Sequence, residues 1–134
     1  MPRPLTDAQF ARLLEFRVAL RQFLQWSELQ AQMVGLTAAQ HQLLVAVRGH
    51  RDPRGPTITD LANYLLVRHH SAIGLIDRVQ ALGLVERQRD PSDQRVVRIT
   101  LTPAGHERVD ALAASHLEEL RHLAPALRAL MGGT

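Results

Sequence analysis

Apolar side chains recur at helical spacing from Phe10 to Met33, and this stripe constrains the fold more than any other feature of the chain. Three more aromatic residues, Phe16, Phe23 and Trp26, lie on the same stripe. A helix of about 28 residues is long for a chain of 134 residues, because it overhangs any core that one chain can build. Since a lone helix cannot bury such a stripe, the pattern predicts helix–helix association and a dimer interface.

A second long helix is predicted at the other end of the chain, where Thr102 and Pro103 form an N-cap followed by a proline. Its apolar positions approach a heptad repeat, with one set at Val109, His116, Leu123 and Leu130 and the other at Ala113, Leu120 and Leu127. We interpret His116 as a polar interface group that sets the register of association. Pro125 is expected to break or kink this helix near His122 and leave a short terminal helix.

The middle of the chain carries the start and stop signals of shorter helices. We predict a helix from the Thr37–Gln40 capping box to Gly49, one from Asp60 to Leu66 with Thr59 as N-cap, and one from His69 to Leu82 that ends at Gly83. The buried side of the last helix is predicted to be Ile73, Leu75, Ile76, Val79 and Leu82. Residues 50–56 are expected to form a loop, and Thr57-Ile58 a very short strand.

Two alternating segments follow, residues 84–89 and 96–101, with a polar turn at 90–95 between them. They predict a two-stranded hairpin with a charged tip. The order helix, turn, helix, hairpin is that of a winged helix-turn-helix. The expected fold is therefore mainly α with a small β-hairpin, in a single domain. Within it, a DNA-binding lobe (37–101) is flanked by dimerisation helices (6–36 and 103–131).

All 16 basic residues are arginine. The absence of lysine has two explanations: selection for bidentate contacts with phosphate, or a GC-rich coding bias. Composition alone does not distinguish between them. The net charge is +1 over residues 1–40, +3 over 41–98 and −1 over 99–134. The basic middle therefore suggests a surface for an anionic partner.

Several classes of function find no support. Cysteine is absent, which excludes disulfides and thiolate sites. The uncharged stretch from Leu29 to Val47 contains polar residues and Gly35, and the first residues lack an apolar segment, so we expect neither a membrane span nor a signal peptide but a cytoplasmic protein. Catalytic motifs are also lacking, so we predict no enzyme and no cofactor.

Several segments in series resemble the MarR family of bacterial transcriptional regulators. They are Thr59–Leu65, Ile76–Val79, Leu82–Arg87, Asp93–Arg95 and Leu101–Gly105. The resemblance implies a homodimer whose recognition helices bind a roughly palindromic operator in double-stranded DNA. We predict that the protein regulates transcription as a repressor. The resemblance also implies wings that reach the flanking minor groove. The segment 68–71 departs from the usual small polar residues, and the wing is short with Pro91 in it, so operator contacts cannot be carried over.

The candidate DNA-binding residues lie on the predicted recognition helix and hairpin: Arg68, His69, His70, Ser71, Gly74, Arg78, Arg87, Arg89, Asp93, Arg95 and Arg98. Arg95 occupies the position that the family inserts into the minor groove, and Asp93 could brace it. Arg78 could contact phosphate or pair with Asp77 or a wing acid. For each of these residues the alternative is an ordinary solvated side chain.

Phe16, Arg17, Phe23 and Trp26 are candidates for an effector pocket that takes a small aromatic anion, as in family members; the alternative is plain dimer core. A zinc site around His116 and His122 is disfavoured, because no HExxH pattern is present. The competing hypothesis for the whole chain is a winged-helix module for protein interaction or assembly with little DNA affinity.

Overall fold

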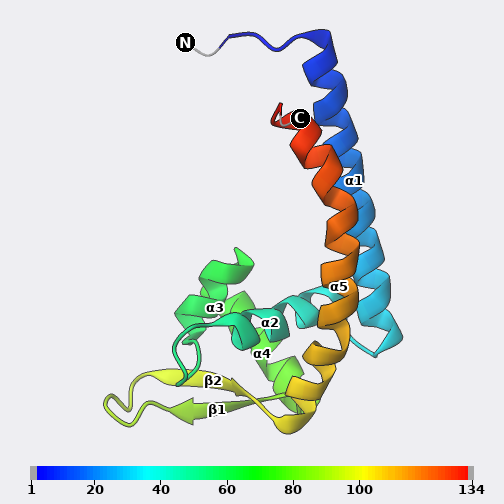
Figure 1. Ribbon diagram of the computed structural model, residues 1–134. Helices are drawn as coiled ribbons and strands as arrows, with labels where there is room; N and C mark the ends of the chain where they lie inside the picture. Colours follow the sequence, from blue (N-terminus) through cyan, green and yellow to red (C-terminus); the bar gives the residue numbers. More distant parts are fainter. Residues whose placement is uncertain (1–2, 133–134) are drawn as a thin grey trace. The chain divides into compact units, whose positions relative to one another are not determined.

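The computed structural model describes residues 3–132, which form five helices and a two-stranded sheet (Figure 1). The elements are α1 (Asp7–Met33), α2 (Ala38–Gly49), α3 (Ile58–Leu65), α4 (His69–Ala81), β1 (Val85–Arg89), β2 (Val97–Leu101) and α5 (Pro103–Leu130). The chain divides into two compact units. We call Met1–Gln30 with Ala113–Thr134 the helical-pair unit, and Ala31–Leu112 the winged-helix unit. The predicted fold class is confirmed.

Reciprocal capping boxes begin two helices of the winged-helix unit. At α2, the Thr37 hydroxyl accepts from the Gln40 amide at 3.1 Å, as predicted. At α3, the predicted N-cap Thr59 is wrong, because Thr57 fills that role. The Thr57 hydroxyl accepts from the Asp60 amide at 3.1 Å, and the Asp60 carboxylate accepts from the Thr57 amide at 2.9 Å. Thr59 has no such partner, since alanine stands three residues after it.

A tight turn joins α3 to α4. Leu66 adopts the left-handed conformation there, with φ 56°, and its side chain is 90% exposed. On α4, Ala72, Ile76 and Val79 are fully buried. Leu82, predicted on the buried side, is instead half exposed as the C-cap of α4. The helix ends at Ala81, and the chain leaves the helix axis at Gly83, whose φ of 76° favours glycine. Leu82 therefore does not lie on the buried face of the helix.

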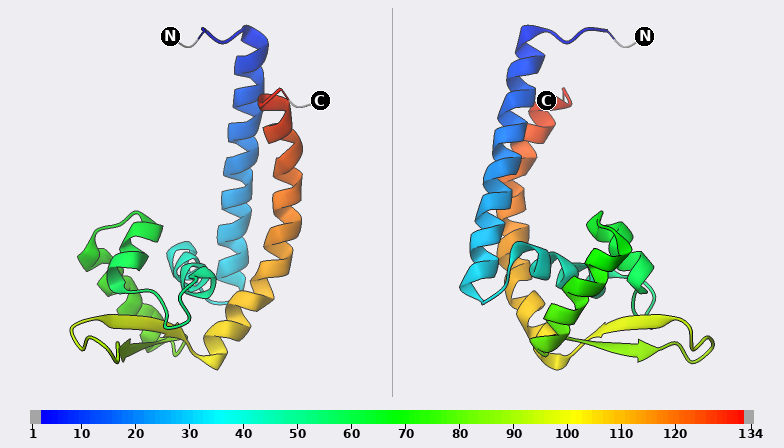
Figure 2. Two further views of the ribbon diagram at one scale, coloured as in Figure 1. Left: turned by 60° about the vertical axis from the view of Figure 1, so that its left-hand side comes forward. Right: turned by 180° about the vertical axis from the view of Figure 1, so that it is seen from behind.

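The hairpin pairs β1 and β2 antiparallel, with Val85 opposite Leu101 and Arg89 opposite Val97. Thr57 forms an isolated bridge to Arg98, so the short strand predicted at Thr57-Ile58 is reduced to one residue and Ile58 belongs to α3. The Ile99 amide also donates to the Pro56 carbonyl at 2.9 Å. The hairpin and its polar loop project beyond the helices of this unit (Figure 2).

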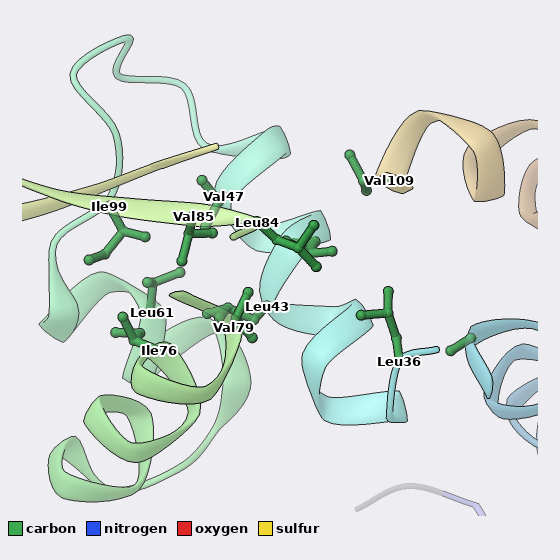
Figure 3. Close-up of a cluster of buried hydrophobic side chains, with 12 residues drawn as sticks. Leu36, Leu43, Val47, Leu61, Ile76, Val79, Leu84, Val85, Ile99 and Val109 are labelled. Atoms are coloured by element: carbon green, nitrogen blue, oxygen red, sulfur yellow. The ribbon is translucent and has the colours of Figure 1, made fainter. Parts of the chain in front are cut away.

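One hydrophobic core holds the winged-helix unit together. Its fully buried side chains come from every element of the helix-turn-helix and from the hairpin: Leu43, Leu44, Leu61, Ile76, Val79, Val85 and Ile99. Figure 3 shows Leu61 of α3 and Ile76 and Val79 of α4 converging beneath the hairpin. Burial of one such side chain contributes about 1.5–3 kcal/mol. This core therefore fixes the start of α4 and the root of the hairpin as one body.

The turn into α5 closes on the strand it follows. The Thr102 amide donates to the Leu84 carbonyl at 3.1 Å, and the Thr102 hydroxyl donates to the Gly83 carbonyl at 2.6 Å. The same hydroxyl accepts from the Gly105 amide at 3.1 Å, which makes Thr102 the predicted N-cap. Gly105 is buried, and a Cβ added to it would overlap the Leu84 carbonyl oxygen. The need for glycine at position 105 thus has a steric cause, whereas its spacing from Thr102 follows from the N-cap hydrogen bond.

In the helical-pair unit, the parts of α1 and α5 that belong to it run side by side (Figure 2). The α1 stripe is half-buried from Leu13 to Trp26 and exposed at Phe10, and none of the residues described in this unit is buried. The predicted break at Pro125 is wrong, because α5 continues through it to Leu130. The proline removes one helical hydrogen bond, to the Arg121 carbonyl, and both residues are exposed to water that can replace it.

His116 is the polar centre of the helical-pair unit. Its Nε2 lies 2.7 Å from the Ser27 hydroxyl. Its ring centroid lies 4.8 Å from that of Trp26, and Phe23 meets it edge-on at 6.1 Å. His116, at a heptad position of α5, thus contacts α1 both through a hydrogen bond to Ser27 and through the rings of Phe23 and Trp26.

We expect Gly105→Ala to destabilise the winged-helix unit by about 2–3 kcal/mol, because the new methyl group must displace the Leu84 backbone rather than a flexible side chain. Gly49→Ala in α2 is the matched control, since a Cβ there meets no atom within 4 Å. Thermal unfolding followed by circular dichroism measures both. Equal melting temperatures for the two variants would contradict the steric account.

Candidate nucleic-acid interface

The first turn of α4 offers a polar, unobstructed surface. Arg68 is the N-cap and makes no side-chain capping bond. His69, His70 and Ser71 follow it, and all four side chains are exposed. The first amides of a helix lack intrahelical partners and carry partial positive charge, so this end attracts anions. The structure therefore brings together four predicted contact residues at one helix terminus.

Farther along α4, Gly74 and Arg78 share a face. The Arg78 guanidinium lies against the glycine, with Nη2 3.8 Å from the place of a Cβ, and it makes no hydrogen bond or ion pair within the described residues. The predicted pairing of Arg78 with Asp77 or a wing acid is wrong. Arg87 of β1 donates to Asp77 and to Gln80, which ties the hairpin to α4.

The wing loop presents one arginine to solvent. The Arg95 side chain is 91% exposed, and its Nε donates to Asp93 at 3.2 Å. Asp93 also accepts from the Arg95 amide at 3.1 Å, which provides the predicted brace. From the strand below, Arg89 donates to the Gln94 carbonyl at 2.7 Å. These contacts restrain the loop backbone while leaving the Arg95 guanidinium accessible.

A buried carboxylate anchors the base of the wing. The Asp90 side chain is 3% exposed and accepts from Arg98 Nε at 2.8 Å, so the two charges compensate each other out of water. Its other oxygen accepts from the Ser92 amide at 2.8 Å and the Ser92 hydroxyl at 2.6 Å. These hydrogen bonds hold the pKa of Asp90 far below its usual range, in spite of burial.

The same network reaches the loop between α2 and α3. Arg98 Nη1 donates to the Gly55 carbonyl at 3.0 Å, and Arg54 Nη1 lies 3.5 Å from Asp90. Arg54 also pairs with Asp52 at 2.7 Å. This pairing holds the pKa of Asp52 well below its usual range and raises the pKa of Arg54. Two loops distant in sequence are thereby clamped together.

The predicted site residues thus differ in their availability. Arg68, His69, His70, Ser71, Arg78, Arg89 and Arg95 are exposed, Gly74 and Asp93 are half-buried, and Arg87 is largely engaged by α4. Arg98 is the least favourably placed for a phosphate, because its side chain is 14% exposed and its Nε and Nη1 both donate within the clamp. Sequence reasoning missed the clamp residues Asp52, Arg54 and Asp90. Aspartate followed by proline at 90–91 was the available signal for an Asx-turn.

The residues predicted for an effector pocket all lie in the helical-pair unit. Phe16, Phe23 and Trp26 are half-buried, whereas Arg17 is exposed. Phe23 also lines a small pocket with His122 and Leu123 of α5. Phe23 and Trp26 both contact His116.

Residues 3–132 contain no helix with the length and apolar character to cross a bilayer. Within the same range, no three metal-binding side chains come together, and His122 lies 3.5 Å from Glu119 without a third ligand.

Comparison with known proteins shows what the sequence and the fold are similar to. A family model described as MarR family matches residues 34–96. An uncharacterised HTH-type transcriptional regulator of Bacillus subtilis, YsmB, is 39% identical over 67 residues, which are 50% of this chain and 46% of that protein. The crystal structure of AbsC, a MarR family transcriptional regulator from Streptomyces coelicolor, superposes with a TM-score of 0.73 at 25% identity, covering 94% of this chain and 84% of AbsC. The chain is therefore similar to MarR family regulators in sequence over residues 34–96 and in fold over most of its length.

Members of the MarR family are transcriptional regulators, not enzymes. A DNA complex of the Staphylococcus aureus protein MepR has the same fold, with a TM-score of 0.70 at 21% identity over 91% of this chain and 85% of MepR. The match to YsmB and that to a second sequence relative each span about half of the relative's length, 46% and 45%.

We expect acid to weaken the winged-helix unit. The pKa values of Asp52 and Asp90 are lower in the folded chain than in the unfolded chain, so the unfolded chain takes up more protons as the pH falls. The stabilisation is present above about pH 4 and is lost below it. Thermal unfolding between about pH 2 and pH 7 measures this for wild type and Asp90→Asn. The variant should melt lower at neutral pH, and the gap should narrow in acid. A gap that does not change with pH would contradict the role of the clamp.

Proposed function

We propose that this protein is a MarR-type, sequence-specific DNA-binding regulator that acts as a homodimer on a roughly palindromic operator. In this proposal α4 enters the major groove and the hairpin reaches the flanking minor groove. The observation that carries it is the Arg95 guanidinium at the tip of the wing, whose side chain stays 91% exposed while it pairs with Asp93. A narrow, A·T-rich minor groove concentrates negative potential and attracts such a group, so Arg95 is the proposed minor-groove contact.

The distribution of ion pairs supports an anionic partner for this surface. Asp77, Asp90 and Asp93 each pair with an arginine, so these three acids contribute little free negative charge. Helix α4 keeps cations that are not engaged at both of its ends: Arg68, its N-cap, makes no side-chain capping bond, and Arg78, in its last turn, makes no hydrogen bond or ion pair within the described residues. The remaining field favours phosphate. MepR, which shares the fold, forms a complex with DNA, and this supports DNA as the anionic partner.

The helical-pair unit supports dimerisation. Half-buried side chains of α1 face α5, yet large apolar side chains on both helices stay exposed. The exposed set includes Phe10, Leu14, Leu24, Leu29, Leu117, Leu120 and Leu127, each at least 40% exposed. Leu120 and Leu127 belong to the second heptad set, which lies open in one chain. A second copy offers the same surface and covers it symmetrically.

We further propose that the regulator represses its target by occupying the promoter, and that a small aromatic anion releases it. Arg17 is exposed and able to meet a carboxylate beside Phe16, Phe23 and Trp26. Such an effector acts through its differential affinity for two spacings of the recognition helices, which must match half-sites about 34–36 Å apart. A reporter fused to the target promoter distinguishes repression from activation, because deletion of a repressor should raise expression of the reporter.

We expect competitor-resistant binding to the duplex upstream of the regulator's own gene, measured by fluorescence anisotropy. Contact with about 6–10 phosphates should lower affinity by roughly 10³–10⁵ between 50 and 200 mM salt. Arg95→Ala should weaken binding by about tenfold or more, through loss of a charge-assisted contact. Arg121→Ala is the control, because that arginine lies in the helical-pair unit and pairs with Glu118. Absence of binding to this duplex and to genomic fragments at low salt would favour a protein-interaction module.

The dimer is tested separately by analytical ultracentrifugation. Leu120→Glu together with Leu127→Glu should shift the protein from dimer to monomer, since two charges would enter an apolar interface. Leu82→Glu is the matched control, because this leucine is 50% exposed in the winged-helix unit. A double variant that remains dimeric would place the interface elsewhere.

A further inference from the structure

The turn between α3 and α4 holds a leucine in a backbone conformation that favours glycine. The turn closes α3 by a hydrogen bond typical of a helix end, in which the Val67 amide donates to the Ala62 carbonyl at 3.1 Å. This closure places Leu66 in the left-handed region, with φ 56°. Among residues 3–132, every other residue with a positive φ is a glycine. The backbone alone would therefore favour glycine at position 66.

Burial does not account for the leucine either. The Leu66 side chain is 90% exposed, so it contributes little to the core of the winged-helix unit. Two neighbours in the sequence are also exposed, Tyr64 at 53% and Val67 at 41%. We call these three residues the turn patch. An exposed apolar patch that includes a strained backbone position is typical of a surface that contacts another molecule.

The turn patch is continuous with the end of α4 that attracts anions. Leu66 lies two residues before Arg68, the N-cap of α4, so their Cα atoms are at most about 7 Å apart. Arg68 makes no side-chain capping bond, and the first amides of α4 carry partial positive charge. The molecule that contacts the patch must therefore offer an apolar group within strongly anionic surroundings.

The major groove of double-stranded DNA presents this combination. The C5 methyl of thymine is the apolar group on the base edges there, and the phosphates of both strands border the groove. The exposed side chains of α4 from His69 to Gln80 are all polar. An exposed apolar side chain beside the N-terminus of α4 is therefore supplied by the turn, with Leu66 as the most exposed of the three.

We propose that Leu66 recognises a thymine in each half-site of the operator by packing against its C5 methyl group. The contact adds sequence preference beside the polar side chains of the first turn of α4. It rests on the proposed DNA binding and extends it by naming a base. Burial of one methyl group corresponds to about a fourfold change in affinity, and two half-sites multiply this to about 15-fold.

Replacement of thymine by uracil removes the methyl groups and keeps the base pairing. The duplex upstream of the regulator's own gene is prepared in both forms, and fluorescence anisotropy measures the affinity for each. The wild type should bind the uracil form about 15-fold more weakly or worse. In Leu66→Gly this penalty should be smaller by about 15-fold, because the partner of the methyl group is gone. Leu82→Ala is the matched control, since this leucine is 50% exposed at the far end of α4, and it should show the wild-type penalty.

The Leu66→Gly variant should fold at least as well as the wild type. Glycine adopts the left-handed conformation without strain, and the side chain that it replaces is almost fully exposed. Thermal unfolding followed by circular dichroism should therefore give an equal or higher melting temperature. A lower melting temperature would overturn the inference that leucine at this position is unfavourable for the fold.

The failure of this contact is distinguishable from the failure of DNA binding itself. An equal uracil penalty in the wild type and in Leu66→Gly would overturn the thymine contact while leaving the proposed regulator intact. Unchanged affinity of Leu66→Gly for the thymine form would do the same, and would favour a protein as the partner of the turn patch. Absence of DNA binding by the wild type would overturn the proposed function and the thymine contact together.

Discussion

The ion pair between Asp90 and Arg98 is the interaction on which the wing depends. It places a nearly buried carboxylate where the hairpin gives way to its loop, and donors from the loop and β2 satisfy both oxygens. A buried charge left without its partner is strongly destabilising, so the pair makes the hairpin root and the 50–56 loop interdependent. Arg95 can extend into solvent because the base beneath it is fixed. The exposed position of Arg95 therefore depends on the buried ion pair between Asp90 and Arg98.

Much of the architecture follows from local chemistry and could be predicted. The capping box at Thr37, the glycine after α4 and the alternation of β1 and β2 are decided by residues a few positions apart. The N-cap of α3 was misplaced by two residues because two threonines compete there, and only the position of Asp60 distinguishes them. Pro125 was expected to break or kink α5, but a single missing hydrogen bond at an exposed position does not interrupt a 28-residue helix.

The candidate site was predicted less completely, for a physical reason. The exposed face of α4 and the tip of the wing follow from helix period and turn chemistry, which act over short distances. The clamp joins Arg54 to Asp90 across 36 residues and Gly55 to Arg98 across 43, and no periodicity encodes such pairs. Arg98 was therefore grouped with the phosphate contacts, although alternation along β2 leaves it half-buried. Surface arginines and structural arginines look alike until the fold brings their partners together.

The contact between Trp26 and His116 gives the helical-pair unit a built-in spectroscopic label. Trp26 is the one tryptophan of the chain, and it lies in this unit against the imidazole ring. Its emission therefore reports on the association of α1 and α5, whereas far-ultraviolet dichroism sums over both units. If the two probes yield different unfolding midpoints, the units do not unfold as one cooperative block. The molecule can thus reveal, without added dyes, whether its two units lose structure together.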